Sequence, residues 1–261
     1  MFDFHMHTLV SFDGQCTAEQ MLAAAEKAGL KEICFTDHMD EIPLKTEQTQ
    51  AFDLDAYSAA YDHLTHADVK IRRGMEFGML PDNKETLANC LRCRPYDFVI
   101  GSVHFAKDLD IYREEFWVGR TIDQAERGVL EDTLACVQHH DDFDVLGHLT
   151  YISKARANPI KRPVSYEMHR DIIDAILQEL ARKDKGIEIN TSGVDRCGTY
   201  LPSLDYLRRF KELGGKIVTV GSDSHDVGRV GQYCFDACAA VQEIFGHVCT
   251  FENRQPIFHK F

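Results

Sequence analysis

The sequence predicts an α/β fold in which a parallel sheet closes into a barrel. Short β-rich runs alternate with helix-forming stretches seven times along the chain, and such alternation is typical of parallel strands joined by helices. The length of 261 residues matches the roughly 250 residues of a barrel that forms one domain. No low-complexity linker, repeat or charge run marks a boundary, so we expect a single domain over residues 1–261.

Local patterns place the elements in chain order. Thr17, with Gln20 three residues later, predicts a capping box at the start of a helix, and Gly29 and Gly214 are typical helix stops. The predicted strands cover residues 2–9, 32–38, 70–78, 97–104, 144–151, 186–192 and 216–224. The predicted helices cover residues 17–29, 54–67, 83–94, 121–140, 165–185, 203–213 and 236–246.

Two segments fall outside this alternation. Residues 105–120 form a long connection that holds the only tryptophan, Trp117, and a long loop in a compact domain is usually functional. The tail, residues 249–261, has an extended pattern, and we expect it to close over the barrel.

The composition is that of a globular protein, with 44% apolar and 27% charged residues. The net charge of −13 disfavours a general nucleic-acid-binding role, which depends on Lys and Arg, but it does not exclude a small phosphorylated substrate. No window approaches the roughly 20 apolar residues of a membrane span. Residues 1–5 lack the pattern of a signal peptide, so we expect a cytoplasmic protein.

The nine cysteines are scattered along the chain, which predicts reduced thiols rather than disulfides. Two pairs are closely spaced, Cys90 with Cys93 and Cys234 with Cys238. Both pairs fall in predicted helices and have no second pair of ligands nearby, so we interpret them as small buried apolar residues rather than zinc ligands.

The 13 histidines carry more information. His5 and His7 are two residues apart on a predicted strand, so their imidazoles point to the same face. Seven other histidines fall on helices or in the tail, and we expect them on the surface: His63, His66, His139, His140, His169, His247 and His259.

Six strand-like runs deliver a His, Asp or Glu at or near their carboxyl ends. In a barrel these ends open on one face, where active sites are found. Mixed imidazole and carboxylate ligands suit Zn, Mn or Fe(II), and so many ligands imply two or three divalent ions. The residues concerned are His5 and His7, His38, Glu76, His104, His148, and Asp223 with His225.

In this order, the residues resemble the polymerase and histidinol phosphatase (PHP) superfamily of metal-dependent phosphoesterases. The resemblance covers essentially the whole chain and implies a distorted (β/α) barrel of seven strands with a trinuclear metal site. Asp13 takes a place where other branches of the family have His. The resemblance assigns His5, His7, Glu76 and Asp223 to the first ion, Glu76, His104 and His148 to the second, and Asp13, His38 and His225 to the third.

Three segments are similar to the histidinol-phosphatase branch: residues 147–156, residues 186–193 followed by Arg196, and residues 220–225. This similarity implies hydrolysis of L-histidinol phosphate to L-histidinol and phosphate, a late step of histidine biosynthesis. It also implies that Arg156 and Arg196 bind the phosphate, a role that suits the bidentate guanidinium group.

A mechanism follows as a hypothesis. Two ions about 4 Å apart can share a hydroxide that attacks phosphorus. Asp223 or His225 is a candidate for managing the proton of the leaving group. In the long connection, Asp108, Asp110, Glu114 and Glu115 are candidates for binding the substrate amine, and Phe116 or Trp117 for stacking on its imidazole. The alternative for this connection is a solvated acidic loop.

Two other functions stay open. The metals could serve a nucleotide or another small phosphomonoester or phosphodiester, although the chain lacks a basic stripe for nucleic acid. Alternatively, the barrel could be an inactive metal-binding module. The oligomeric state is left open.

Overall fold

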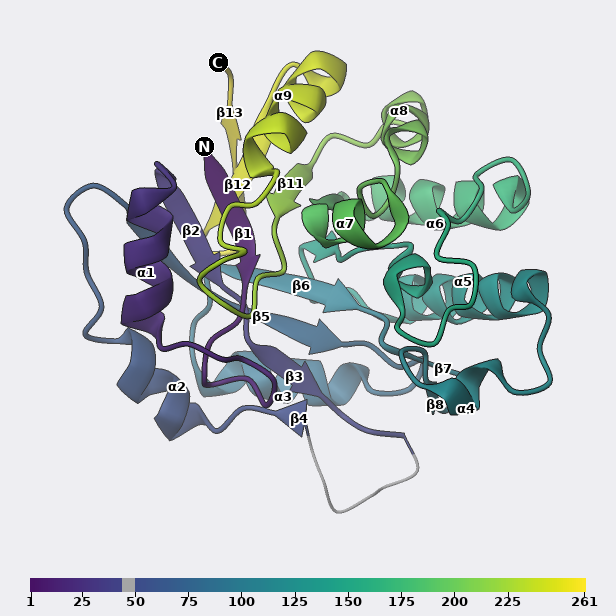
Figure 1. The fold of residues 1–261 in the computed structure, drawn as a ribbon, viewed down its shortest axis with the longest axis horizontal. Helices are drawn as coiled ribbons and strands as arrows, with labels where there is room; N and C mark the ends of the chain where they lie inside the picture. The colour runs from purple at the N-terminus through teal and green to yellow at the C-terminus, as the bar shows by residue number, and fades with distance from the viewer. Residues whose placement is uncertain (44–49) are drawn as a thin grey trace.

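A computed structural model describes residues 1–43 and 50–261. Seven parallel strands form a nearly closed barrel in the order β1-β2-β5-β6-β9-β10-β11 (Figure 1), which confirms the predicted fold class. Predicted strand 70–78 is reproduced in full as β5, whereas the others are shorter. The barrel strands are β1 (Phe2–Met6), β2 (Glu32–Phe35), β5 (Lys70–Gly78), β6 (Phe98–Ser102), β9 (Val145–Leu146), β10 (Gly186–Asn190) and β11 (Val218–Gly221).

Helices surround the sheet, with α1 and α2 on one side of the barrel and α5, α6 and α8 on the other (Figure 1). The Thr17–Gln20 capping box is present, and Gly29 and Gly214 have the positive φ of helix ends. The helices are α1 (Ala18–Lys27), α2 (Leu54–Tyr61), α3 (Lys84–Cys93), α4 (Glu114–Trp117), α5 (Ile122–His139), α6 (Arg170–Arg182), α7 (Val194–Cys197), α8 (Leu204–Glu212) and α9 (Cys234–Phe245), with 3-10 turns η1 (Tyr151–Lys154) and η2 (Thr191–Gly193). In the described part of the chain, no helix is long and apolar enough to cross a membrane.

The second strand is broken, which the sequence did not predict. β2 ends at Phe35, and β3 (His38–Asp40) begins after Thr36 and Asp37. At this break, the Asp37 carboxylate accepts a hydrogen bond from the Thr8 backbone N–H at 2.8 Å. β3 then pairs with the second half of β5 and with β4 (Gln50–Ala51). This break places His38 directly opposite Glu76.

The barrel closes between its first and last strands through few backbone contacts. The N–H of His7 donates to Ser224 O, and the N–H of Asp223 donates to His5 O, both at 2.8 Å. The buried carboxylate of Asp3 adds to this seam, because it accepts hydrogen bonds from the backbone N–H groups of Ser222 at 2.8 Å and Gly231 at 2.9 Å. The seam therefore joins the first and last barrel strands next to the expected ligands.

The long connection, residues 105–120, forms a small hairpin of β7 (Phe105–Ala106) and β8 (Leu109–Asp110), followed by α4. Lys107 and Asp108 occupy its turn with positive φ values of 52° and 62°. Two positive φ values suit the twist of a tight hairpin. The segment thus has a defined fold, while three of its acidic side chains, Asp108, Glu114 and Glu115, are exposed.

The predicted surface positions of two histidines are wrong. His140 is 1% exposed and contacts Leu80 O through Nε2 at 2.8 Å. His169 is 5% exposed and contacts Glu126 Oε2 at 3.0 Å. The helix α6 begins directly after His169, at Arg170, rather than at the predicted residue 165.

All nine cysteines are unpaired, as predicted. Cys234 and Cys238 are buried, which agrees with the apolar interpretation. Cys93 is exposed, so that interpretation is wrong there. Cys93 lies in the last turn of α3, where its thiol donates to Asn89 O at 3.3 Å.

The C-terminal tail forms a hairpin of β12 (Val248–Glu252) and β13 (Gln255–His259) across the amino ends of the barrel strands. Its turn residues, Asn253 and Arg254, donate their N–H groups to Asp97 at 3.0 and 2.8 Å. The Arg254 guanidinium also contacts the buried carboxylate of Asp144. The tail therefore closes the end of the barrel opposite the expected site.

Replacing Arg254 with Ala should lower the free energy of unfolding by about 2 kcal/mol, because Asp144 would stay buried without its cation. Chemical denaturation measures this change. Arg208→Ala is the control, since the structure pairs its exposed side chain with Asp205 one helical turn away. The control should change stability by less than about 0.5 kcal/mol. Equal effects in the two variants would contradict the role of the Arg254 contact.

Burial lowers the pKa of His140 below its ordinary value. The folded state therefore binds a proton at His140 less readily than the unfolded state, and this site loses stability as the pH falls below about 6.5. Gln at this position can donate to Leu80 O without titrating. Between pH 7.5 and 5.5, the wild type should lose more unfolding free energy than His140→Gln. Parallel losses in denaturant titrations at both pH values would refute this prediction.

Candidate metal centre

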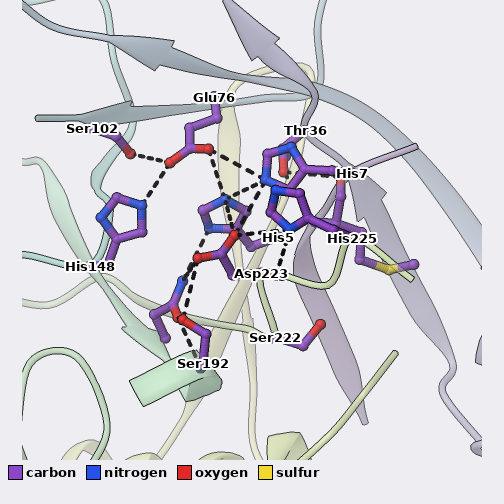
Figure 2. A network of polar contacts seen from close by, with 12 residues as sticks. His5, His7, Thr36, Glu76, Ser102, His148, Ser192, Ser222, Asp223 and His225 are labelled. Carbon is purple, nitrogen blue, oxygen red and sulfur yellow. Dashed lines mark hydrogen bonds and ion pairs between the residues drawn. The ribbon is translucent and has the colours of Figure 1, made fainter. Parts of the chain in front are cut away.

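The predicted ligand side chains converge at the carboxyl end of the barrel, and Figure 2 shows the central part of this cluster. Every one of them lies within 4.0 Å of at least one other member through its nitrogen or carboxylate oxygen atoms. They are His5 in β1, His7 and Asp13 after it, His38 in β3, Glu76 in β5, His104 after β6, His148 after β9, and Asp223 and His225 after β11.

Glu76 lies at the centre and is fully buried. Its Oε1 atom is 2.8 Å from His148 Nε2 and 3.2 Å from His104 Nε2. Its Oε2 atom is 3.1 Å from His5 Nε2 and 3.2 Å from His38 Nδ1. Each oxygen therefore faces a different pair of imidazoles, the arrangement expected of a carboxylate that bridges two ions.

His5 and His7 present ring nitrogens to the same point. The Nδ1 of His5 lies 2.7 Å from Glu188 Oε1 and must donate, because a carboxylate only accepts. The Nδ1 of His7 lies 3.1 Å from Ser11 Oγ, whose hydroxyl donates to Asp37 at 2.9 Å, so this Nδ1 also donates. In neutral rings both Nε2 atoms then carry lone pairs, and they are 3.1 Å apart. Two facing lone pairs at this distance favour a cation between them.

The Oε2 atom of Glu76 gives a second indication. Imidazole nitrogens of His5, His7 and His38 lie within 3.4 Å of it, yet among the described residues it has no hydrogen-bond partner. A buried carboxylate oxygen without a partner is costly unless another group meets it. The donor set is imidazole and carboxylate, which suits zinc. The residues therefore fit a group of divalent ions.

The surroundings shift the pKa values of the imidazoles in two directions. Burial lowers the pKa of His7 and of His148, which favours the neutral form that binds metals. Burial also disfavours a charged His5, but the carboxylates of Glu188 and Glu76 outweigh it and raise the pKa of His5 well above its ordinary value. At His38 and His104 too, burial is outweighed by nearby carboxylates, which raise the pKa. The carboxylates of the cluster thus favour positive charge around these three rings.

Asp13 marks the outer edge of the cluster. Its Oδ2 atom is 3.1 Å from His225 Nε2 and 3.7 Å from His38 Nε2. Burial opposes its ionisation, but the hydrogen bond with His225 and the charge of His38 lower the pKa of Asp13 to about 2. The ring of His7 stacks between His38 and His225 at centroid distances of 4.3 and 4.2 Å. Asp13 therefore lies beside His38 and His225, the two other residues expected at the third ion.

Three polar residues at the cluster were missed by sequence reasoning. Glu188 contacts His5, and its position between Ile187 and Ile189 on a predicted strand was a signal for an inward carboxylate. Asp40 contacts His104 Nδ1 at 3.1 Å, two residues after His38. Lys154 contacts the carboxylate of Asp223 and lies 2.9 Å from Ser192 Oγ, and no spacing pattern pointed to it.

A cleft of about 830 Å³ opens over the cluster. Arg156 and Arg196 line it, the first after η1 and the second on α7, as do Lys154, Arg113 and Arg229. Acidic and aromatic residues line the same cleft: Asp110, Glu114, Glu115, Phe12, Tyr112 and Tyr151. The cleft thus presents cations, carboxylates and rings above a centre rich in ligands.

The expected stacking residues are not in this cleft. Phe116 is fully buried in the core, so its predicted role is wrong. Trp117 donates its Nε1–H to Ile111 O at 3.2 Å and does not line the cleft, and neither does Asp108, which lies in the turn between β7 and β8. The exposed ring at the cleft is Phe12, which is 58% exposed and lies 5.3 Å from the ring of His38.

Comparison with known proteins agrees with this geometry. Residues 3–192 match the PHP domain. A histidinol-phosphatase of Lactococcus lactis is 34% identical over 85% of this chain and 83% of its own length, and a probable histidinol-phosphatase of Clostridium acetobutylicum is 32% identical over 88% and 89%. A crystal structure of the histidinol phosphate phosphatase of L. lactis, complexed with zinc, L-histidinol and phosphate, superposes with a TM-score of 0.84 at 29% identity, covering 98% of both chains. The chain belongs to the PHP domain family, in its histidinol-phosphatase branch.

Proposed function

We propose that this chain is a metal-dependent phosphomonoesterase that hydrolyses L-histidinol phosphate to L-histidinol and phosphate. The observation that carries the proposal is the Glu76-centred group of imidazoles and carboxylates beneath a cleft lined by arginines. The similar L. lactis enzyme, whose structure holds zinc, L-histidinol and phosphate, supports the same substrate here.

The proposed metal centre holds three ions. His5, His7, Glu76 and Asp223 would bind the first, Glu76, His104 and His148 the second, and Asp13, His38 and His225 the third. Zinc suits this ligand set, and Mn and Fe(II) are the alternatives. When bound, such ions supply a water molecule of lowered pKa and stabilise negative charge on a phosphoryl group.

The residues around the centre supply the remaining functions. Arg156 and Arg196 would bind the phosphate oxygens, and Lys154 adds a third cation at the floor of the cleft. Local cations thereby offset the net charge of −13. His225 is 24% exposed at the cleft, whereas Asp223 is 4% exposed. Of the two proton-transfer candidates, His225 is therefore the more exposed. Both also belong to the proposed ligand sets, and His225 Nδ1 lies 3.0 Å from Asp223 O, so proton transfer by either residue would compete with its role as a ligand.

The amine and imidazole of the substrate would be met at the upper cleft. The Asp110 carboxylate already accepts hydrogen bonds from Tyr112 N at 2.8 Å and Arg113 Nε at 3.2 Å. Glu114 and Glu115 are exposed on the same side, which makes them the better candidates for the ammonium group. Phe12 offers the exposed aromatic face that Phe116 cannot provide.

Steady-state phosphate release from L-histidinol phosphate, with zinc or manganese loaded, tests the proposal. A kcat/KM of about 10⁴ M⁻¹s⁻¹ or above, with p-nitrophenyl phosphate, a nucleotide monophosphate and a phosphodiester each about a hundredfold lower, is expected. Similar weak rates on all monoesters would remove the substrate assignment. A preference for the diester would favour the nucleotide or phosphodiester alternative, and no turnover with full metal content would indicate an inactive module.

Glu76→Ala should lower turnover at least about a hundredfold, because the proposed bridge between two ions is lost. Metal content per chain, measured by mass spectrometry of the elements, should fall in parallel. Glu167→Ala is the control, because Glu167 is exposed and does not line the cleft. Wild-type phosphate release by Glu76→Ala, with metals replete, would refute the bridging role.

Phe12→Ala should raise KM for L-histidinol phosphate severalfold while leaving KM for 2-aminopropyl phosphate, which lacks the imidazole, unchanged. Stacking of two rings contributes about 1 kcal/mol, which corresponds to this change. Leu9→Ala is the matched control, since Leu9 is 60% exposed on the same loop and does not line the cleft. An equal rise of KM for both esters would exclude an imidazole contact.

A further inference from the structure

Glu188 is a buried carboxylate in the middle of β10 that lies outside the proposed ligand set, and it is 1% exposed. Its Oε1 atom accepts the Nδ1–H of His5 at 2.7 Å. Its Oε2 atom accepts the backbone N–H of His148 at 2.8 Å and the side-chain amide of Asn190 at 3.1 Å. Donors from β1, from the segment after β9 and from β10 itself therefore point at one side chain that can only accept.

The neighbouring backbone is shaped around this carboxylate. A Cβ atom added at Gly221 would lie 2.5 Å from Glu188 Oε1 and 2.3 Å from His5 Cβ. A Cβ atom at Gly147 would lie 2.4 Å from Ser102 Oγ and 3.6 Å from Glu188 Oε2. Glycine at position 221 therefore leaves room for both His5 and Glu188, whereas glycine at position 147 leaves room for Ser102 of β6 and only touches Glu188. The carboxylate is thus packed closely against β11 and β1.

These contacts act on two different parts of the centre. The hydrogen bond to His5 fixes the ring so that Nε2 faces His7 and Glu76. The hydrogen bond to the backbone of His148 fixes the position from which its Nε2 reaches Glu76 Oε1 at 2.8 Å. His5 belongs to the proposed first ion and His148 to the second.

We infer that Glu188 is a positioning residue that holds ligands of the first and second ions in register. It links the two sites through hydrogen bonds and binds neither the ions nor the substrate. The inference rests on the proposed metal sites, but it is independent of which phosphoester is hydrolysed. Outer partners of metal-binding histidines typically contribute 10–100-fold to metal affinity.

The test compares Glu188→Gln with Glu126→Gln, in the full-length chain loaded with zinc. Gln keeps the size of Glu188 but presents an NH₂ group to at least one of its three donors. Glu126 is the control, because it is also buried, at 2% exposure, and lies outside the proposed metal centre. There it contacts His169 Nε2 at a distance of 3.0 Å. The readouts are zinc retained per chain against a competing chelator and the thermal midpoint without metal.

Glu188→Gln should bind zinc about 10–100-fold more weakly at two sites, with Glu126→Gln like the wild type. If Glu188→Gln does not fold, zinc retention is measured in Glu188→Asp instead. This variant keeps the charge, but its side chain is too short to reach both His5 and His148, so the same loss of zinc is expected. Retention of zinc as in the wild type by the folded Glu188 variant would overturn the inference, and so would equal loss in Glu126→Gln. If zinc loss is selective but L-histidinol phosphate is not hydrolysed by the wild type, the substrate proposal fails and the role of Glu188 stands.

Discussion

The structure depends on keeping one buried carboxylate, Glu76, surrounded by imidazoles. Burial opposes the charge of Glu76, but His5, His104 and His38 outweigh burial and lower its pKa well below the ordinary value. Those rings must be held at fixed angles for this to work. Glu188, Asp40 and the Ser11–Asp37 pair hold them from outside. The polar interior at this end of the barrel is therefore built in two layers, in which the outer layer determines where the inner nitrogens point.

The demands of this cluster explain the irregularities of the sheet. The second strand breaks at Thr36 and Asp37, and the break both supplies the Asp37 acceptor and places His38 opposite Glu76. The seam between β1 and β11 has little regular pairing, because the residues there serve as candidate ligands. The opposite end of the barrel carries no such demand, and the C-terminal hairpin closes it with ordinary ion pairs and apolar packing.

Much of this arrangement could be predicted from the sequence. Strand-to-helix alternation predicted the barrel, and the polar residues at strand ends predicted which side chains converge, because parallel strands share one carboxyl edge. Ligation by these nine residues stays a prediction. Burial set by tertiary contacts could not be predicted, so Phe116, His140 and His169 were misplaced. Glu188 was missed although its position between two isoleucines of a strand was a signal, because that signal does not indicate which group the carboxylate contacts.

The seam between β1 and β11 has a consequence for folding. The proposed first ion takes ligands from residues 5 and 7 and from residue 223, so two segments that lie far apart in the sequence must meet before this site exists. Pairing between such distant segments closes slowly. The complete first site therefore forms only when the barrel closes, and a metal ion bound there would stabilise the closed barrel over the open one.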